Sequence, residues 1–321
     1  MVFIQANRDA ILKSLLTVTG IVERRHTMPI LANVLITKRG EHVSFLASDA
    51  EIQISTTSEL GVGSEDVGTT VSAFKIRDIL KALPEDSQVS IKLDDRKATI
   101  QAGRSRFSLQ TLSDADFPTL ASIDQWPVSL TLTQKQLRGL LQSVSYAMAV
   151  QDVRYYLNGI LLSTSGDTIR AVATDGHRLA FSEARLDGTA MPKQEVILPR
   201  KSVIELQRLL GDSDDPVTVD IAERQIRLRF DQIEFISKLV DGKYPDYQRV
   251  IPTTHRNRLH VSREQFAAAL SRASITCTHN GSQMSPGSQP STVVAPLPSA
   301  RMIPTRPIAS DKFHSAPDNR F

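Results

Sequence analysis

Residues 198–221, LPRKSVIELQRLLGDSDDPVTVDI, decide the fold because an earlier part of the chain has the same pattern. Residues 75–93 read KIRDILKALPEDSQVSIKL, and in both places an apolar helical stripe leads through a turn into a short strand. RSRFSLQTL and DADFPTL follow the first stretch, and FDQIEFISKL and KYPDYQRV follow the second. The equivalent prolines, Pro118 and Pro245, lie 127 residues apart. A fixed long period indicates that one structural unit has been copied.

The first half of the unit is copied as well. ANRDAILKSLLTVTGIV resembles TQKQLRGLLQSVSYAMAV, and LANVLITKRGEHVSFLASDAEIQIS resembles YLNGILLSTSGDTIRAVATDGHRLAFS. A third copy begins with LHVSREQFAAALSRASI and breaks off before a stretch rich in proline and serine. The repeat predicts a first unit over 1–124, a second over 125–252, the start of a third over 253–277 and an unmatched, disordered tail over 278–321.

The periodicity within each unit predicts helix, strands, helix, strands. Apolar residues fall on one face of the first helix at Ile11, Leu15 and Val18. Short alternating segments such as NVLIT and VSFLAS predict strands, and short turns between them leave no room for crossover helices. The expected fold class is α+β: repeated units of antiparallel sheet with two helices each, two copies complete and the third partial.

Composition limits the possible functions. With 321 residues, 40% of them hydrophobic, and a net charge of +3, the chain resembles an ordinary soluble protein of two or three domains. No apolar run is long enough to cross a membrane, and the N-terminus lacks a signal-peptide core, which favours the cytoplasm. The lone Cys277 excludes an internal disulfide, and no Cys/His spacing suggests zinc.

Basic residues occur on the polar face of each predicted helix. They are Arg8, Lys13, Lys75, Arg77 and Lys81 in the first unit, Lys135, Arg138, Arg200, Lys201 and Arg208 in the second, and Arg263 and Arg272 in the third. One such face is usually only a solvated surface. Copied units place equivalent helices on the same side, however, where their charges can form one surface that holds phosphates without recognising bases. The sequence leaves both interpretations open.

Several long strings resemble the bacterial DNA polymerase III beta subunit, the sliding clamp: HTMPILANVL, GRSRFSLQTL, QDVRYYLNGILL, ATDGHRLA, LPRKSVIEL and SKLVDGKYPDYQRV. The match is collinear over about residues 1–275. The resemblance implies the DNA clamp fold, with three similar domains per chain and a homodimer closed head to tail around duplex DNA. It also implies a non-catalytic processivity subunit of a DNA-directed DNA polymerase, with no cofactor. Its partners would be DNA polymerase III subunits, the clamp loader and other proteins with a clamp-binding motif.

Six residues match the DNA-facing set of that family. They are Arg25, Gln151, Arg154, Tyr155, Tyr156 and Lys201. Arg and Lys pair with phosphate, Gln donates without charge, and Tyr stacks or hydrogen-bonds at the nucleic-acid backbone. Because adjacent residues of an extended segment point to opposite sides, one of the two tyrosines is expected in the core, and Tyr156 is the preferred DNA contact.

Nine residues match the family's peptide-binding groove, where partner proteins insert a short motif with apolar and aromatic anchors. They are Leu157, Thr174, Gly176, His177, Arg178, Leu179, Pro245, Arg249 and Val250. The apolar members would supply the walls that such anchors need, and Gly176 permits close backbone approach. Two simpler interpretations stay open: Asp175-Gly176 is also a turn signal, and His177 with Arg178 can be a polar pair at the rim.

An enzyme is the alternative from a different functional class. Asp175 and His177 could act as an acid–base couple, with Ser182 or Asp241 as partner. The sequence has no nucleophile elbow, glycine-rich phosphate loop or paired-carboxylate metal cluster. The equivalent string in the first unit, ASDAE, lacks the histidine, which indicates a shared turn that became specialised for binding in the second unit.

The break in the third copy predicts a mechanical defect. Residues 276–321 depart from the family pattern and resemble an out-of-frame or foreign extension, with a natural flexible tail as the simpler alternative. In the family, the ring closes when the dimer edge of the first domain, here Phe107 and Leu109, pairs with the third domain of the partner chain. We therefore expect a monomer or ill-defined oligomer with weakened peptide binding. The expected function is the processivity clamp that the resemblance implies, and the alternative is a defective clamp that binds partners or DNA without encircling it.

Overall fold

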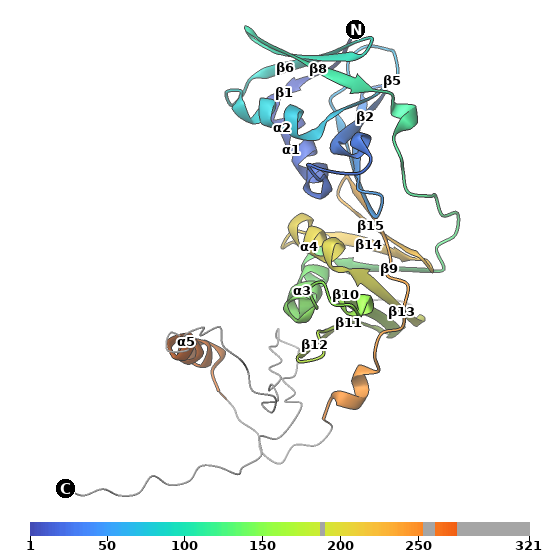
Figure 1. Cartoon of the computed structure of the whole chain (residues 1–321), viewed down its shortest axis with the longest axis vertical. Helices are drawn as coiled ribbons and strands as arrows, with labels where there is room; N and C mark the ends of the chain where they lie inside the picture. The colour runs from blue at the N-terminus through green and yellow to red at the C-terminus, as the bar shows by residue number, and fades with distance from the viewer. Residues whose placement is uncertain (187–189, 253–260, 275–321) are drawn as a thin grey trace, which may run out of the picture.

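A computed structural model describes residues 1–186, 190–252 and 261–274. Those residues form an N-terminal unit (1–120) and a central unit (128–252), followed by one more helix (Figure 1). The elements of the N-terminal unit are β1 (Val2–Asn7), α1 (Arg8–Val18), β2 (Asn33–Arg39), β3 (His42–Ser48), β4 (Ile52–Glu59), β5 (Val67–Ser72), α2 (Ala73–Ala82), β6 (Gln88–Asp94), β7 (Lys97–Ala102) and β8 (Ser105–Leu112).

The central unit repeats this order of elements one for one. Its elements are β9 (Val128–Thr133), α3 (Gln134–Val144), β10 (Gly159–Gly166), β11 (Thr168–Thr174), β12 (Leu179–Arg185), β13 (Met191–Pro199), α4 (Arg200–Leu209), β14 (Pro216–Ile221), β15 (Gln225–Phe230) and β16 (Ile233–Lys238). Thus β4 corresponds to β12, and β8 corresponds to β16. The helix α5 (Arg263–Ser274) follows this unit and lies within the predicted third segment.

The strands of the described residues form two antiparallel sheets. Twelve of them lie in the order β1-β6-β7-β8-β5-β2-β3-β4-β16-β15-β14-β9, and four lie in the order β12-β11-β10-β13. Each strand pair in the described part of the chain is antiparallel. The predicted α+β class, with antiparallel sheet and two helices in each unit, is therefore confirmed.

The first helix of each unit begins at a residue whose side chain caps it. Asn7 Oδ1 accepts a hydrogen bond from the backbone N–H of Asp9 at 2.8 Å. Thr133 and Gln136 form a reciprocal capping box, in which each side chain accepts from the other residue's backbone N–H, at 3.1 and 3.0 Å. The apolar stripe predicted for α1 is fully buried, so it is the face that packs on the core.

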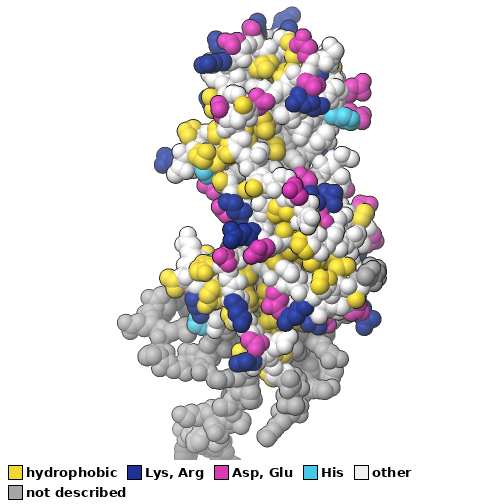
Figure 2. All heavy atoms as spheres, turned by 90° about the vertical axis from the view of Figure 1, so that its right-hand side faces the viewer, with side chains coloured by type: hydrophobic (Ala, Val, Ile, Leu, Met, Phe, Trp, Pro, Cys, Tyr) yellow, Lys and Arg dark blue, Asp and Glu magenta, His cyan; other side chains and the backbone are white. Residues whose placement is uncertain are grey.

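The four helices α1–α4 lie along one side of an elongated body (Figure 1). Figure 2 shows a second face, turned by 90° toward the chain that connects the two units. Basic and acidic side chains are interspersed there with apolar ones, and no broad area of a single charge appears. The arrangement of helices in Figure 1 agrees with the repeat, which predicted that the copied units place their helices on a common side.

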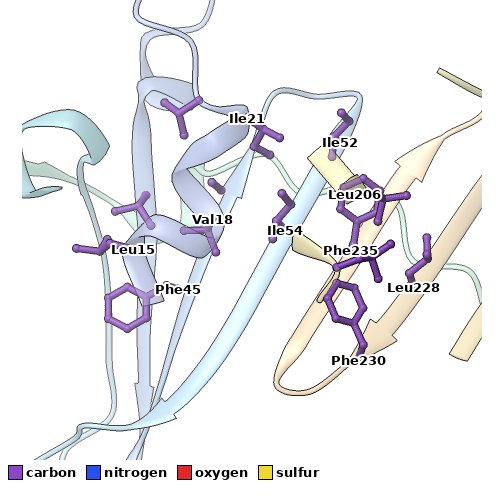
Figure 3. Packing of buried hydrophobic residues seen from close by; sticks show 14 of the residues in the cluster. Leu15, Val18, Ile21, Phe45, Ile52, Ile54, Leu206, Leu228, Phe230 and Phe235 are labelled. Atoms are coloured by element: carbon purple, nitrogen blue, oxygen red, sulfur yellow. The ribbon is translucent and has the colours of Figure 1, made fainter. Parts of the chain in front are cut away.

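Strand pairing between β16 and β4 joins the two units. Phe235 lies opposite Ile54 at this junction, and both side chains are fully buried (Figure 3). On the helix side, the guanidinium of Arg208 in α4 donates to the carbonyl oxygens of Leu16 and Thr17 in the last turn of α1, at 3.1 and 2.7 Å. A cation at the C-terminal end of a helix is favourable. A single cluster of buried apolar residues runs through both units.

The predicted segment boundaries fall in three places. The boundary at 124/125 lies within residues 121–127, a connection without helix or strand. The start of the third unit at 253 falls among residues 253–260, which lie outside the described residues. Cys277 and the predicted tail also lie outside them. The four segments stay predictions.

Candidate functional site

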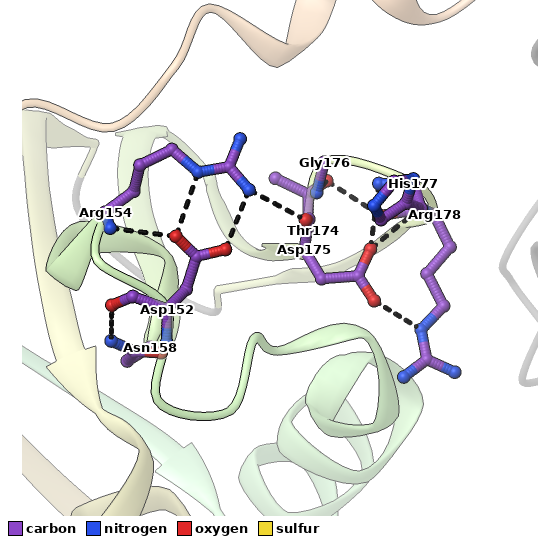
Figure 4. A network of polar contacts seen from close by, with 8 residues as sticks. All are labelled: Asp152, Arg154, Asn158, Thr174, Asp175, Gly176, His177 and Arg178. Atoms are coloured by element: carbon purple, nitrogen blue, oxygen red, sulfur yellow. Dashed lines mark hydrogen bonds and ion pairs between the residues drawn. The ribbon is translucent and has the colours of Figure 1, made fainter. Parts of the chain in front are cut away.

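The turn between β11 and β12, residues 174–178, carries four of the predicted binding residues. The carboxylate of Asp175 organises it (Figure 4). Its Oδ1 accepts from the backbone N–H groups of His177 and Arg178, and its Oδ2 accepts from Arg178 Nε, all at 2.9 Å. Burial raises the pKa of Asp175, but these hydrogen bonds outweigh it and bring that pKa below its ordinary value. Gly176 has φ +89°, a conformation that favours glycine.

A second carboxylate, Asp152, organises the neighbouring loop. It accepts from the side chain of Arg154 twice, at 2.7 and 3.0 Å, and from the Arg154 backbone N–H at 2.8 Å. The same guanidinium donates to the carbonyl oxygen of Asp175 at 3.2 Å. The side chain of Asn158 donates to the Asp152 carbonyl oxygen at 2.9 Å. Arg154 thus connects this loop to the 174–178 turn (Figure 4).

We expect the carboxyl group of Asp152 to titrate well below the ordinary pKa of an aspartate. The Arg154 side chain and then its backbone N–H lower the pKa of Asp152 from 3.8 to about 2. Because the folded-state pKa is depressed, the stabilisation is present above about pH 4 and is lost as the pH falls toward 2. A carbon-detected NMR titration of the carboxyl group measures this, with Arg154→Ala expected to move the midpoint upward toward 3.8. A midpoint near 3.8 in the unchanged chain would contradict the contact.

An apolar cluster covers the face of the four-stranded sheet opposite the main core. This outer cluster consists of Ala149, Leu157, Leu161, Val172, Leu179, Ile197, Tyr244 and Tyr247. Strand alternation separates it from the core, since neighbours such as Leu162 and Ala171 point to the other face. Phe181 and Ile251 are partly buried against its margin, and the Phe181 and Tyr247 rings lie 6.1 Å apart. The margin therefore offers partly exposed aromatic and aliphatic surface.

Tyr244 connects the outer cluster to the turn. Its ring is buried, its hydroxyl oxygen accepts from the Thr174 backbone N–H at 2.9 Å, and burial raises its pKa. Tyr244→Phe leaves that N–H unpaired, and we expect the free energy of unfolding to fall by about 1–3 kcal/mol in urea titrations. Tyr155→Phe removes a hydroxyl from a tyrosine that is 58% exposed and should change stability by less than about 0.5 kcal/mol. Equal effects of the two substitutions would refute the structural role of the Tyr244 hydroxyl.

The structure brings much of the predicted peptide-binding set together. Leu157 and Leu179 are members of the outer cluster. Thr174 lies at the start of the turn, where its hydroxyl donates to the Arg178 carbonyl oxygen at 2.7 Å. Pro245 directly follows the tyrosine that connects cluster and turn.

The last two members of the set lie in a short 3-10 helix, Tyr247–Val250. The side chain of Arg249 is 85% exposed and pairs with Asp246 at 2.8 Å. Val250 is 52% exposed, next to Ile251 at the margin of the outer cluster. Val250 is therefore an exposed apolar side chain beside the buried residues of the outer cluster.

The predicted DNA-facing residues lie in separate places. Arg25 is exposed in the segment after α1, whereas Gln151 and Arg154 lie in the loop after α3. Lys201 lies at the junction, where its ammonium group pairs with Glu23 at 2.7 Å and with Asp49. Burial lowers the pKa of Lys201, but these two carboxylates outweigh it and leave that pKa raised.

The order expected for the two tyrosines is wrong with respect to exposure. Tyr155 is 58% exposed, whereas Tyr156 is partly buried against the outer cluster. The expectation assumed an extended segment, but Tyr155–Leu157 is a 3-10 helix in which side chains do not alternate. Tyr155 is thus the more exposed of the two tyrosines. Its ring packs edge-on against that of Tyr156, with 5.8 Å between the ring centroids.

Several of the helix cations are engaged within the chain. Ion pairs join Arg77 to its neighbour Asp78 at 2.7 Å and Arg208 to Glu205 three residues earlier. Lys13, Lys75 and Lys135, in contrast, are exposed. A solvated face and a phosphate-holding face both remain compatible with this arrangement, because exposed lysines suit either one.

Sequence reasoning missed Asp152, Tyr244 and Tyr247. The two tyrosines had a usable signal, because an aromatic residue precedes the repeated proline in both units: Phe117 is buried in the first unit as Tyr244 is in the second. Asp152 had no usable sequence signal, because its partner Arg154 lies only two residues away and an acidic and a basic residue at this spacing are common in loops.

Asp175, which the acid–base alternative would use in catalysis, has a structural role in the turn. The Asp175 carboxylate accepts its hydrogen bonds from the backbone and from Arg178, as a turn-forming aspartate does. Among the described residues, no group of three or more His, Cys, Asp or Glu side chains is placed to hold a metal ion. The described helices also include none long and apolar enough to span a membrane.

Comparisons with known proteins agree with the fold and the repeat. Residues 1–121 match the family model described as DNA polymerase III beta subunit, N-terminal domain, and residues 131–246 match that of the central domain. The beta sliding clamp of Pseudomonas putida is 44% identical, and that of Escherichia coli K12 is 41% identical, each over 84% of this chain and 73% of the relative.

Solved structures show the same relationship. The sliding clamp of Pseudomonas aeruginosa superimposes with a TM-score of 0.80 at 41% identity, covering 85% of this chain and 74% of that one. The Bacillus subtilis clamp gives a TM-score of 0.82 at 27% identity, covering 88% and 76%. Fold, repeat and sequence together define a clamp-type subunit of a DNA polymerase. The chain belongs to the family of DNA polymerase III beta subunits, the beta sliding clamps, and its role is that of a processivity clamp.

Proposed function

We propose that this chain tethers the replicative DNA polymerase, the clamp loader and other clamp-motif proteins to duplex DNA, without chemistry of its own and in the cytoplasm. The observation that carries the proposal is the 174–178 turn beside the outer cluster. It presents fixed backbone groups next to partly exposed apolar side chains. Such a surface suits a short peptide with apolar and aromatic anchors, which makes it a docking site for many partners.

The DNA contact in this proposal is made with phosphates. The helices α1–α4 share one side of the body, and Lys13, Lys75 and Lys135 are exposed on them (Figure 1). Arg25 and Tyr155 add an exposed cation and an exposed ring. Contacts of this kind carry no sequence information and weaken steeply with salt, so a clamp that uses them can move along the duplex.

Retention on circular DNA tests the function. The full chain is incubated with clamp loader, ATP and a nicked circular plasmid, and the bound fraction is separated by gel filtration. A chain that encircles DNA stays on the circle and is lost when the plasmid is linearised. Equal retention on both forms indicates a binding surface that ignores topology, and the absence of retention on either form contradicts the DNA part of the proposal.

A second candidate function is partner or DNA binding without encirclement. The predicted dimer-edge residues distinguish it from a closed ring: within one chain, Phe107 is 36% exposed and Leu109 is buried next to it. Over residues 105–110, the β8 strand pairs only with β7 among the described residues. Pairing of this edge with a second chain is what separates a closed ring from binding without encirclement.

A further inference from the structure

Lys201, one of the predicted DNA-facing residues, is paired with two carboxylates of the other unit. It lies in the first turn of α4, at the end of the central unit that faces the N-terminal unit (Figure 1). Its ammonium group pairs with Glu23 at 2.7 Å and with Asp49. We propose that Glu23 competes with DNA: its carboxylate occupies the place on Lys201 that a backbone phosphate takes when the duplex binds. This inference rests on the DNA contact proposed above.

The two carboxylates on Lys201 differ in how firmly they are held. The Asp49 side chain is 5% exposed, and its Oδ1 accepts from the backbone N–H groups of Glu51 and Ile52 at 2.9 and 2.6 Å. These hydrogen bonds fix Asp49 in the turn between β3 and β4. The Glu23 side chain is 53% exposed and belongs to the segment after α1, which has neither helix nor strand at this residue. Glu23 is therefore the carboxylate that can leave.

The ammonium group of Lys201 can be reached from solvent, since its side chain is 43% exposed. The exposed Arg25 lies two residues after Glu23, so its Cα is within about 7 Å of the Glu23 Cα. A predicted phosphate contact thus follows the competing carboxylate on the same segment. When Glu23 leaves, Lys201 and Arg25 offer one cation from each unit, and phosphate binding takes up both of them.

Release of Glu23 leaves the junction between the units closed. Asp49 still pairs with Lys201, Arg208 still donates to carbonyl oxygens at the end of α1, and β16 still pairs with β4. An exposed ion pair contributes little, so displacing this one weakens DNA binding by no more than about fivefold. The duplex can therefore displace Glu23, and the competition keeps the hold on phosphates loose.

Glu23→Gln tests the competition directly. The amide keeps the shape of the side chain but removes the charge that holds Lys201, so we expect duplex DNA to bind roughly two- to fivefold more tightly. Fluorescence anisotropy with a short labelled duplex measures the Kd in about 0.1 M salt, where charges more than about 10 Å apart are largely screened. Glu85→Gln is the matched control. It removes an exposed carboxylate from the turn between α2 and β6, which carries none of the predicted DNA-facing residues, and should leave the Kd unchanged.

A double-substitution cycle with Lys201→Met shows whether the effect passes through Lys201. Lys201→Met alone should weaken DNA binding and reduce the slope of log K against log salt by about 1, as loss of one phosphate contact does. In the Lys201→Met chain, Glu23→Gln should then give no gain, because the cation that it would release is gone. Near-UV circular dichroism shows that each variant is folded.

Crosslinking of the unchanged chain gives a second measurement that needs no substitution. A carbodiimide joins paired amines and carboxylates, and mass spectrometry quantifies the Lys201–Glu23 product. Lys238 and Glu51, which pair at 3.1 Å across the same junction and are 45% and 65% exposed, provide the internal control. A duplex without terminal phosphates should suppress the Lys201–Glu23 product and leave the Lys238–Glu51 product unchanged.

The outcomes separate this inference from the DNA contact on which it rests. The competition is refuted if Glu23→Gln and Glu85→Gln bind DNA equally, if the gain persists in the Lys201→Met chain, or if the duplex leaves the Lys201–Glu23 product intact. In each of these cases the unchanged chain still binds DNA. Absence of binding by the unchanged chain and by Glu23→Gln contradicts the DNA contact itself, and the competition with it.

Discussion

Val250→Asp is expected to weaken binding of a clamp-motif peptide to the full chain by roughly 30-fold, equivalent to about 2 kcal/mol. Val250 is 52% exposed and precedes Ile251, which packs against the outer cluster. A carboxylate at this point must lose water when an apolar anchor approaches, and this desolvation is costly. Fluorescence anisotropy with a labelled peptide that carries a DNA polymerase's clamp-binding motif measures the Kd.

Val153→Asp provides the matched control for this variant. Val153 is 95% exposed in the loop after α3, so the same chemical change adds the same charge without touching the outer cluster. Its Kd should stay within a factor of about two of the unchanged chain. Equal weakening by both variants would point to general charge repulsion, and tight binding by Val250→Asp would place the peptide elsewhere.

Phe235→Ala is expected to lower the free energy of unfolding by about 3–5 kcal/mol, because it opens a cavity in the strand pair that joins the units. Phe235 is fully buried opposite Ile54. The loss should also separate the unfolding of the two units, so that guanidinium titrations followed by circular dichroism and by Trp126 fluorescence no longer coincide. Trp126 reports on the central unit, where Arg227 lies 4.5 Å from its ring centre.

The equivalent substitution in the N-terminal unit, Phe107→Ala, serves as the comparison. It removes the same side chain from the corresponding position, which is 36% exposed, and should cost less than about 1 kcal/mol at protein concentrations where copies do not associate. If the two substitutions had equal effects, the β16–β4 pairing would not be what buries Phe235.

The local elements of the fold were predictable because each has a local cause. The stripe through Ile11, Leu15 and Val18 defines α1, and a 127-residue repeat assigns the same order of elements to the central unit. The pairing of β16 with β4 was not predictable in this way. Its residues are about 180 positions apart, and no periodicity specifies which distant edge a strand will choose.

The features of the candidate site were likewise predictable only where their cause is local in the sequence. The Asp175-Gly176 turn was readable from its own residues, and it forms as a turn. The tyrosine pair was misjudged because a 3-10 helix at Tyr155–Leu157 replaced the extended segment that was assumed. The contact between Arg154 and the Asp175 carbonyl oxygen depends on tertiary folding, which brings residues 21 positions apart together.

The connection over residues 121–127 does not itself fix the relative position of the two units, which other contacts determine. It is largely exposed and has no helix or strand, while sheet pairing on one side and the contacts of Arg208 and Lys201 on the other hold the units together. Proteolytic nicking near Asp124 should therefore leave one particle of unchanged hydrodynamic size. The polypeptide link acts as a tether during folding, and the angle between the units is a property of their surfaces.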